Sequence, residues 1–76
     1  MNIKDIKYYC ALVKTKNFSK VAEQFSVSQP TITLAIKRLE KAFDTTFFIR
    51  DQSHRELRIT EAGQQFFLHA QVILNE

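Results

Sequence analysis

The stretch VSQPTITLAIKRLE, Val27 to Glu40, predicts a helix with one apolar face and one polar face. Ser28 is a good N-cap residue, and Pro30 falls in the first turn, where its missing N–H costs little. Apolar residues then recur at helical spacing, at Ile32, Ala35, Ile36, Leu39 and Phe43. We therefore expect a helix over about residues 28–43 with a continuous buried stripe.

The other face of this helix contains no acidic residue. A step of roughly 100° per residue places Gln29 at its N-terminal edge and the following side chains on the face itself: Pro30, Thr33, Leu34, Lys37, Arg38 and Lys41. Threonine and glutamine can hydrogen-bond to base edges, and glutamine can pair bidentately with adenine. Lysine and arginine suit phosphates, and the helix start attracts an anion. A single exposed lysine or arginine usually only binds water, so the prediction of DNA contact depends on the whole set.

Leu34 is the apolar member of this face, and two interpretations of it stay open. It either touches the methyl group of a thymine or is one of the exposed apolar residues that need no explanation. The rival function for the face is protein–protein contact, which would need an exposed apolar or acidic helix. Leu34 slightly favours that rival, and the absence of acids counts against it.

The preceding segment predicts two more helices. The first spans about Ile3 to Lys14, is capped by Asn2 and carries a buried stripe that begins at Ile3. Asn17 then suits a left-handed turn, and Ser19 is a candidate N-cap for a short helix that ends near Phe25. The tight connection SVS joins this short helix to the next one, which predicts a helix-turn-helix.

The segment after Phe43 predicts a hairpin and a final helix. TFFIRD (46–51) and ELRIT (56–60) are β-prone and are separated by polar residues, and Thr60 can cap a helix that runs to the end. The predicted fold class is mainly α: a winged helix-turn-helix, with a three-helix core and a two-stranded β wing, followed by a long linker helix. We expect residues 1–60 to form the DNA-binding domain and residues 61–76 the linker and dimerisation helix.

The composition fits this interpretation. The 76 residues make one small domain, and the single cysteine, Cys10, can build neither an internal disulfide nor a metal cluster. No apolar run approaches the roughly 18 residues of a membrane span, so we expect a cytoplasmic protein. Residues 1–46 hold eight Lys or Arg against four acids, a net charge of +4, and residues 47–76 hold three against four. This basic half indicates either a polyanionic partner or an ordinary solvated surface.

Enzyme activity has little support in the sequence. Cys10 lies on the predicted buried stripe of the first helix, and His54 and His69 have no carboxylate clearly placed beside them. Gly63 is the only glycine, so no phosphate-binding glycine loop exists. We expect no catalytic residues, no metal ligands and no cofactor.

The segment NFSKVAEQFSVSQPTITLAIKRLEKAF, followed by TFFIRD and LRITEAG, resembles the N-terminal DNA-binding domain of LysR-type transcriptional regulators. The resemblance covers nearly the whole chain. It implies a bacterial, nucleoid-associated transcription factor that binds an approximately palindromic, A·T-rich operator as a homodimer. It also implies a recognition helix in the major groove and a wing, residues 51–56, near the minor groove.

The resemblance and the outer face together define the expected contacts. Base contacts are expected from Gln29, Pro30, Thr33 and Leu34. Phosphate or wing contacts are expected from Ser19, Ser28, Thr31, Lys37, Arg38, Lys41, Arg50, His54 and Arg55. The chain departs from the family at Leu34, where members commonly carry arginine, and in its less basic wing DQSHRE.

The last helix predicts a contact with a partner. Ala62, Phe66, Ala70 and Ile73 form one apolar face, and Leu68 and Val72 lie almost opposite. We expect dimerisation through Phe67, Leu68, Val72 and Leu74, the other interpretation being a helix packed fully within its own domain. The family appends a larger domain that senses a small molecule and is missing here. The absence of a C-cap signal in the last helix favours a fragment over a stand-alone protein.

Overall fold

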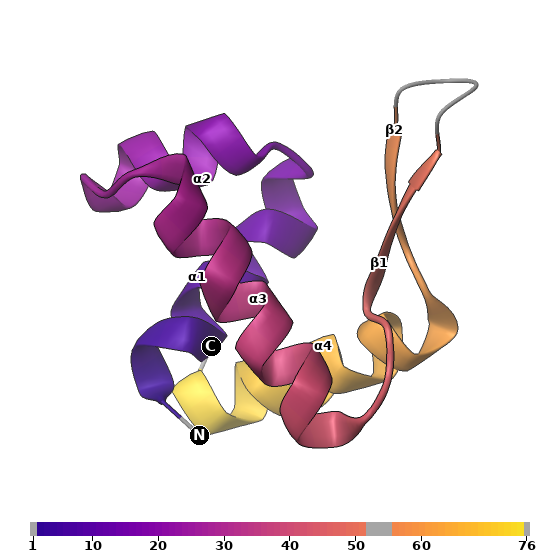
Figure 1. The fold of residues 1–76 in the computed structure, drawn as a ribbon. Helices are drawn as coiled ribbons and strands as arrows, with labels where there is room; N and C mark the ends of the chain where they lie inside the picture. The colour runs from indigo at the N-terminus through magenta and orange to yellow at the C-terminus, as the bar shows by residue number, and fades with distance from the viewer. Residues whose placement is uncertain (1, 52–55, 76) are drawn as a thin grey trace.

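The computed structural model describes residues 2–51 and 56–75, and it contains four helices and one hairpin within them (Figure 1). The elements in chain order are α1 (Ile3–Thr15), α2 (Phe18–Phe25), α3 (Gln29–Phe43), β1 (Phe48–Asp51), β2 (Glu56–Ile59) and α4 (Glu61–Leu74). The predicted order of helices, hairpin and final helix is confirmed. Among the described residues, no helix combines the length and the apolar character that crossing a bilayer requires.

Three of the four predicted N-caps are confirmed, at Asn2, Ser28 and Thr60. The prediction of Ser19 as the cap of α2 is wrong. The side chain of Asn17 accepts the hydrogen bond from the backbone N–H of Lys20, so the helix begins earlier, at Phe18. Asn17 itself is extended, with φ −143°, whereas the left-handed turn was expected there. The left-handed residue is Lys16, with φ 53°.

The last helix also ends on a cap that the sequence analysis did not find. Asn75 is left-handed, with φ 59°, and its backbone N–H points to the carbonyl oxygens of Gln71 and Val72. Asparagine adopts this conformation more readily than most side chains. The expectation of an uncapped end was therefore wrong.

The hairpin is antiparallel and short. Phe48 pairs with Ile59 and Asp51 with Glu56, and the residues between 51 and 56 lie outside the described part of the chain. The first strand begins at Phe48, two residues later than TFFIRD predicted. The backbone N–H of Phe47, just before it, donates to the Glu40 carboxylate at 2.7 Å.

The core is aromatic at its centre. Tyr9 is fully buried, and its ring lies 4.9 to 5.4 Å, centroid to centroid, from the rings of Phe47, Phe48 and Phe66. Its hydroxyl donates a 2.6 Å hydrogen bond to the carbonyl oxygen of Gly63. α1 is thereby tied to both the wing base and the start of α4.

Three apolar residues that we expected inside are partly outside. Ile3, Phe43 and Ile73 are 50%, 44% and 46% exposed. Each lies within the first or last turn of its helix. The apolar stripe is therefore only partly covered at these helix ends, and the ring of Phe43 lies 4.8 Å from that of Phe66.

Candidate nucleic-acid interface

The helix α3 is held in place by polar contacts at two points. Arg38 forms a bidentate ion pair with Asp5 of α1, with donor–acceptor distances of 2.9 and 3.0 Å. Further along, the Glu40 carboxylate accepts the backbone N–H groups of Phe47 and Phe48 at 2.7 and 3.3 Å. α3 is thus fixed to the helical core on one side and to the base of the wing on the other.

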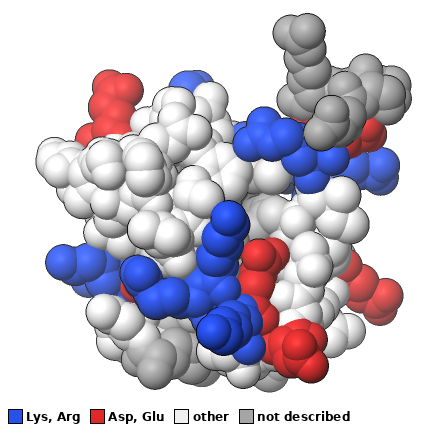
Figure 2. All heavy atoms as spheres, viewed as in Figure 1, with Lys and Arg blue, Asp and Glu red and all other residues white. Residues whose placement is uncertain are grey.

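The outer face of α3 lies in solvent, as its sequence predicted. Pro30, Leu34, Lys37, Arg38 and Lys41 are exposed, and Thr33 is half-buried. Glu40 is the only acid in the helix, and it serves the wing rather than this face. Figure 2 shows lysine and arginine side chains gathered over α3, with further basic side chains beside the wing.

The hydroxyl groups at the start of α3 already have partners. Ser28 accepts the backbone N–H of Thr31, and the two side-chain oxygens lie 2.9 Å apart. On the neighbouring helix, the Ser19 hydroxyl donates to the side-chain oxygen of Gln29 at 3.3 Å. This contact leaves the amide NH2 of the exposed Gln29 side chain available to an outside acceptor.

Two hollows lie between α3 and the wing. They hold about 250 and 180 Å³ and are adjacent, because both are lined by Phe18, Arg50 and Leu57. We call them together the wing-side groove. Its polar lining comprises Lys16, Asn17, Ser19, Gln29, Thr33, Lys37, Glu40 and Arg50. The fold therefore brings Ser19, Gln29, Thr33, Lys37 and Arg50 onto one concave face.

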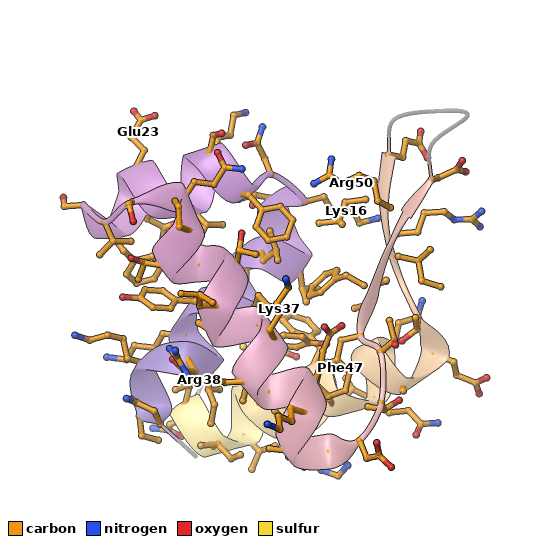
Figure 3. The ribbon with its side chains drawn as sticks, viewed as in Figure 1. Lys16, Glu23, Lys37, Arg38, Phe47 and Arg50 are labelled. Atoms are coloured by element: carbon orange, nitrogen blue, oxygen red, sulfur yellow. The ribbon has the colours of Figure 1, made fainter. Side chains whose placement is uncertain are left out.

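Arg50 is the cation that the wing contributes to this groove. Its guanidinium carbon lies 5.8 Å from the centroid of the Phe18 ring, within the range of a cation–π contact. Lys16 lines the same hollow, and Figure 3 shows both side chains in the space between the helices and the wing. Sequence reasoning missed Lys16, although a basic residue directly before the cap of α2 was a usable signal.

Arg38 lies apart from these residues. Figure 3 shows it on the side of α3 away from the wing, where it meets Asp5. Its side chain is 59% exposed, whereas that of Asp5 is 5% exposed. The hydrogen bonds that Arg38 donates to Asp5 raise the pKa of the Arg38 guanidinium, so the group stays charged. His54 and Arg55, expected at the wing tip, lie outside the described residues.

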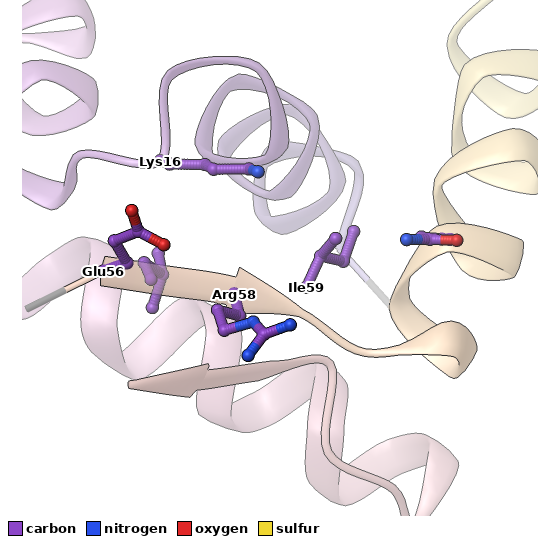
Figure 4. A pocket seen from close by; sticks show the side chains of 6 residues that line it. Lys16, Glu56, Arg58 and Ile59 are labelled. Carbon is purple, nitrogen blue, oxygen red and sulfur yellow. The ribbon is translucent and has the colours of Figure 1, made fainter. Parts of the chain in front are cut away.

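A larger hollow of about 530 Å³ lies between β2, the end of α1 and the start of α4 (Figure 4). Lys16, Glu56, Arg58 and Gln64 contribute its polar lining. Glu56 is exposed in this hollow and would repel a polyanion, whereas the Glu40 carboxylate in the wing-side groove accepts the backbone N–H groups of Phe47 and Phe48. Within residues 2–51 and 56–75, no three His, Cys, Asp or Glu side chains are grouped so that they could hold a metal ion.

The expected dimerisation residues divide into two pairs. Leu68 and Val72 are 64% and 78% exposed on α4. Phe67 and Leu74 are half-buried and pack against the core. α4 therefore has one apolar side inside the domain and a second that the described chain leaves uncovered.

Comparisons with known proteins agree with this fold and surface. A family model described as "Bacterial regulatory helix-turn-helix protein, lysR family" matches residues 3–64. The malolactic fermentation system transcriptional activator of Lactococcus lactis is 41% identical over 76 residues, which are all of this chain and 26% of that protein. The regulator CysL of Bacillus subtilis is 38% identical over 72 residues, covering 87% of this chain and 24% of its own length.

Solved structures of DNA-binding domains also match the fold of this chain. The complex of the CbnR DNA-binding domain with DNA matches with a TM-score of 0.89 and 32% identity, over 99% of this chain and 84% of that one. The complex of the BenM DNA-binding domain with catB site 1 DNA also matches with a TM-score of 0.89, at 25% identity, over 99% of this chain and 78% of that one.

This chain spans about a quarter of the length of the curated relatives named here. Those relatives are named as a transcriptional activator and a transcriptional regulator, which confirms the expectation that the chain is not an enzyme. The family match, the relatives and the winged helix-turn-helix fold agree with one another, and the chain belongs to the lysR family of bacterial regulatory helix-turn-helix proteins, as a DNA-binding domain.

Proposed function

We propose that α3 enters the major groove of an operator and reads it through Gln29, Pro30, Thr33 and Leu34. The observation that carries this proposal is the exposed, acid-free outer face of α3 beside the wing-side groove. The free amide NH2 of Gln29 can donate a hydrogen bond to an acceptor on a base edge, as a bidentate contact with adenine requires. Two structurally similar proteins, CbnR and BenM, have DNA-binding domains solved in complex with DNA, which supports the same role for this domain.

The phosphate contacts in this proposal surround the base-reading residues. Lys37 and Lys41 lie along α3, where they would face the walls of the DNA major groove. Ser19, Lys16 and Arg50 line the wing-side groove of the protein. Ser28 and Thr31 would act at the start of α3, and His54 and Arg55 would reach the minor groove. Arg38 uses Nε and Nη2 on Asp5, which leaves Nη1 for a phosphate.

The proposal extends to the whole regulator. We take residues 1–60 as the DNA-binding unit and residues 61–76 as a linker helix that pairs two copies. A pair of such domains suits an approximately palindromic, A·T-rich operator, because a two-fold protein matches a two-fold site. A small-molecule effector would act through the larger domain that the resemblance implies. The regulator would work in the bacterial cytoplasm, at the nucleoid.

Salt dependence of DNA binding tests the electrostatic part of the proposal. The affinity for duplex DNA should fall with salt by a log–log slope of about −0.9 per phosphate neutralised. Lys37→Ala should lower the magnitude of that slope by about one and weaken operator and random DNA alike. Lys7→Ala, an exposed lysine of α1 outside the wing-side groove, is the matched control. A flat salt response would contradict the proposal.

Selectivity tests the base-reading part. Gln29→Ala should weaken binding to the preferred operator by roughly 1–3 kcal/mol, because one bidentate base contact gives that much discrimination. Binding to random DNA should hardly change. Equal losses on both DNAs would instead make Gln29 a backbone contact.

A further inference from the structure

Leu34 stands at the middle of the exposed face of α3. Its side chain is 54% exposed, although residues on the opposite side of the same helix, such as Ile32 and Ala35, are completely buried. The residues one turn before and after it, Pro30, Lys37 and Arg38, are exposed as well. Leu34 therefore forms an apolar apex that the described chain leaves more than half exposed.

The surroundings of this apex indicate what kind of surface it meets. Lys37 and Arg38 flank it with positive charge, and the only acid of α3, Glu40, is engaged with the backbone of the wing base. A polyanion is the partner that such flanks attract. When the face of α3 enters a major groove, the apex residue lies toward the base edges, while the flanking cations lie toward the phosphates.

The chemistry of the base edges narrows the contact further. A leucine side chain neither donates nor accepts hydrogen bonds. Against guanine, adenine or cytosine it would shield polar base atoms from water without pairing them, which is unfavourable. The thymine methyl group is the apolar feature that the four bases present in the major groove.

We propose that Leu34 is a specificity-determining residue that selects thymine by packing against its 5-methyl group. This inference rests on the proposed entry of α3 into the major groove. Pro30, one turn earlier on the same exposed face, lengthens the apolar surface that the methyl group would meet. Leu34 therefore selects a base by apolar contact, beside a Gln29 that selects by hydrogen bonding.

Replacement of thymine by deoxyuridine tests the contact at the level of one methyl group. The preferred duplex is first selected from a random library with this 76-residue chain. Each thymine is then changed singly to deoxyuridine, which removes the methyl group and preserves base pairing. For the wild type, at least one change should weaken binding about four-fold, equivalent to about 0.8 kcal/mol for one buried methyl group.

Variants of Leu34 show whether the effect belongs to that side chain. Leu34→Ala should bind the thymine and deoxyuridine duplexes with nearly equal affinity at the sensitive position. The matched control Ile3→Ala removes a similarly exposed apolar side chain from α1 and should retain the four-fold difference. Leu34→Arg should change the preference at that position toward guanine, because arginine pairs bidentately with guanine.

The results separate this inference from the proposed function. If no selected duplex binds better than random DNA, the proposed function fails. If a selected duplex binds well but every deoxyuridine effect is the same in wild type and Leu34→Ala, only the thymine contact is overturned. A Leu34→Ala variant that binds every duplex as the wild type does would likewise place Leu34 away from the bases.

Discussion

Arg38 and Asp5 form a two-point ion pair between α3 and α1, with Nε 3.0 Å from Oδ2 and Nη2 2.9 Å from Oδ1. The Asp5 side chain is 5% exposed, so this ion pair offsets the cost of burying its carboxylate. An arginine that the sequence assigned to phosphates alone therefore also supports the fold. For this reason Lys37 is the cleaner probe of phosphate binding.

Arg38→Ala should lower the melting temperature, because it leaves the Asp5 carboxylate buried without its bidentate partner. Lys41→Ala removes an exposed cation from the same helix and should change the melting temperature little. The double variant Asp5→Asn with Arg38→Ala should recover part of the loss, since the buried charge is gone. Thermal unfolding followed by circular dichroism measures all three, and equal melting temperatures for Arg38→Ala and Lys41→Ala would contradict the expectation.

Glu40→Ala should destabilise the domain by about 2 kcal/mol, because it removes charge-assisted hydrogen bonds to the backbone of the wing base. Urea titration gives the free energy of unfolding, and hydrogen exchange should show faster exchange at the Phe47 and Phe48 amides. Glu40→Gln keeps one carbonyl acceptor and should lose less. Glu23→Ala, on the exposed side of α2 in Figure 3, is the control. A Glu40→Ala variant as stable as this control would show that the wing base is held by other contacts.

Gly63→Ala should destabilise the domain by roughly 1–3 kcal/mol, because the added methyl group has no room. Its Cβ would lie 2.6 Å from the carbonyl oxygen of Phe47 and 2.7 Å from Cγ1 of Ile59. Glycine is thus required where α4 approaches the end of the hairpin. Gln64→Ala, an exposed neighbour, should stay within about 0.5 kcal/mol of the wild type in the same urea titration. Unchanged stability of Gly63→Ala would mean that Phe47 and Ile59 can move away from the added methyl group at little cost in free energy.

Tyr9 should make the stability of the domain fall at alkaline pH. Burial, followed by the nearby Cys10 and Glu40, raises the pKa of its phenol above the ordinary value of about 10. Below about pH 10 both folded and unfolded chains hold the proton, so this stability is fully present. Above that pH the unfolded chain releases the proton first, and stability is lost as the pH rises toward the folded-state pKa.

Comparison with Tyr9→Phe isolates this effect from the titration of lysines. Near pH 8 the wild type should be more stable by about 1 kcal/mol, from the hydrogen bond to Gly63. By about pH 11 the wild type should lose roughly 1.4 kcal/mol relative to Tyr9→Phe, the value of one pKa unit, so that Tyr9→Phe becomes the more stable of the two. Urea titrations across this pH range measure the difference. A difference that stays constant would show that the pKa of the Tyr9 phenol is the same in the folded and unfolded chains, which would contradict a raised pKa.

Much of the fold could be predicted because local signals and periodicity agree in this chain. Ser28, Pro30 and the stripe from Ile32 to Leu39 predicted α3 almost to the residue. The cap of α2 was missed because Asn17 and Ser19 are both good capping residues, and their order of preference depends on the turn that precedes them. Helix ends such as Phe43 were misjudged because periodicity does not show where the neighbouring element stops.

The candidate site was predictable only in part, for a related reason. The exposed face of α3 follows from the helical period, so Lys37 and Leu34 were identified correctly as exposed. The pairing of Arg38 with Asp5 joins residues 33 positions apart, and no local pattern indicates it. Lys16 lines the wing-side groove at a sharp turn of the chain, where Lys16 is left-handed and Asn17 is extended. The helical period does not predict such a turn.

The uncovered side of α4 gives the last prediction, which concerns self-association. Leu68 and Val72 are four positions apart, lie on one side of the helix and are 64% and 78% exposed, so Leu68→Glu or Val72→Glu should yield a folded monomer. Gln65→Glu adds the same charge at an exposed polar position of α4 and should leave the wild-type association unchanged. Sedimentation at high protein concentration measures the mass, and circular dichroism confirms that each variant is folded. A wild type that remains monomeric at every concentration would remove the basis for pairing through α4. Loss of the dimer in Leu68→Glu alone would centre the contact on Leu68, near the middle of the helix, rather than on Val72.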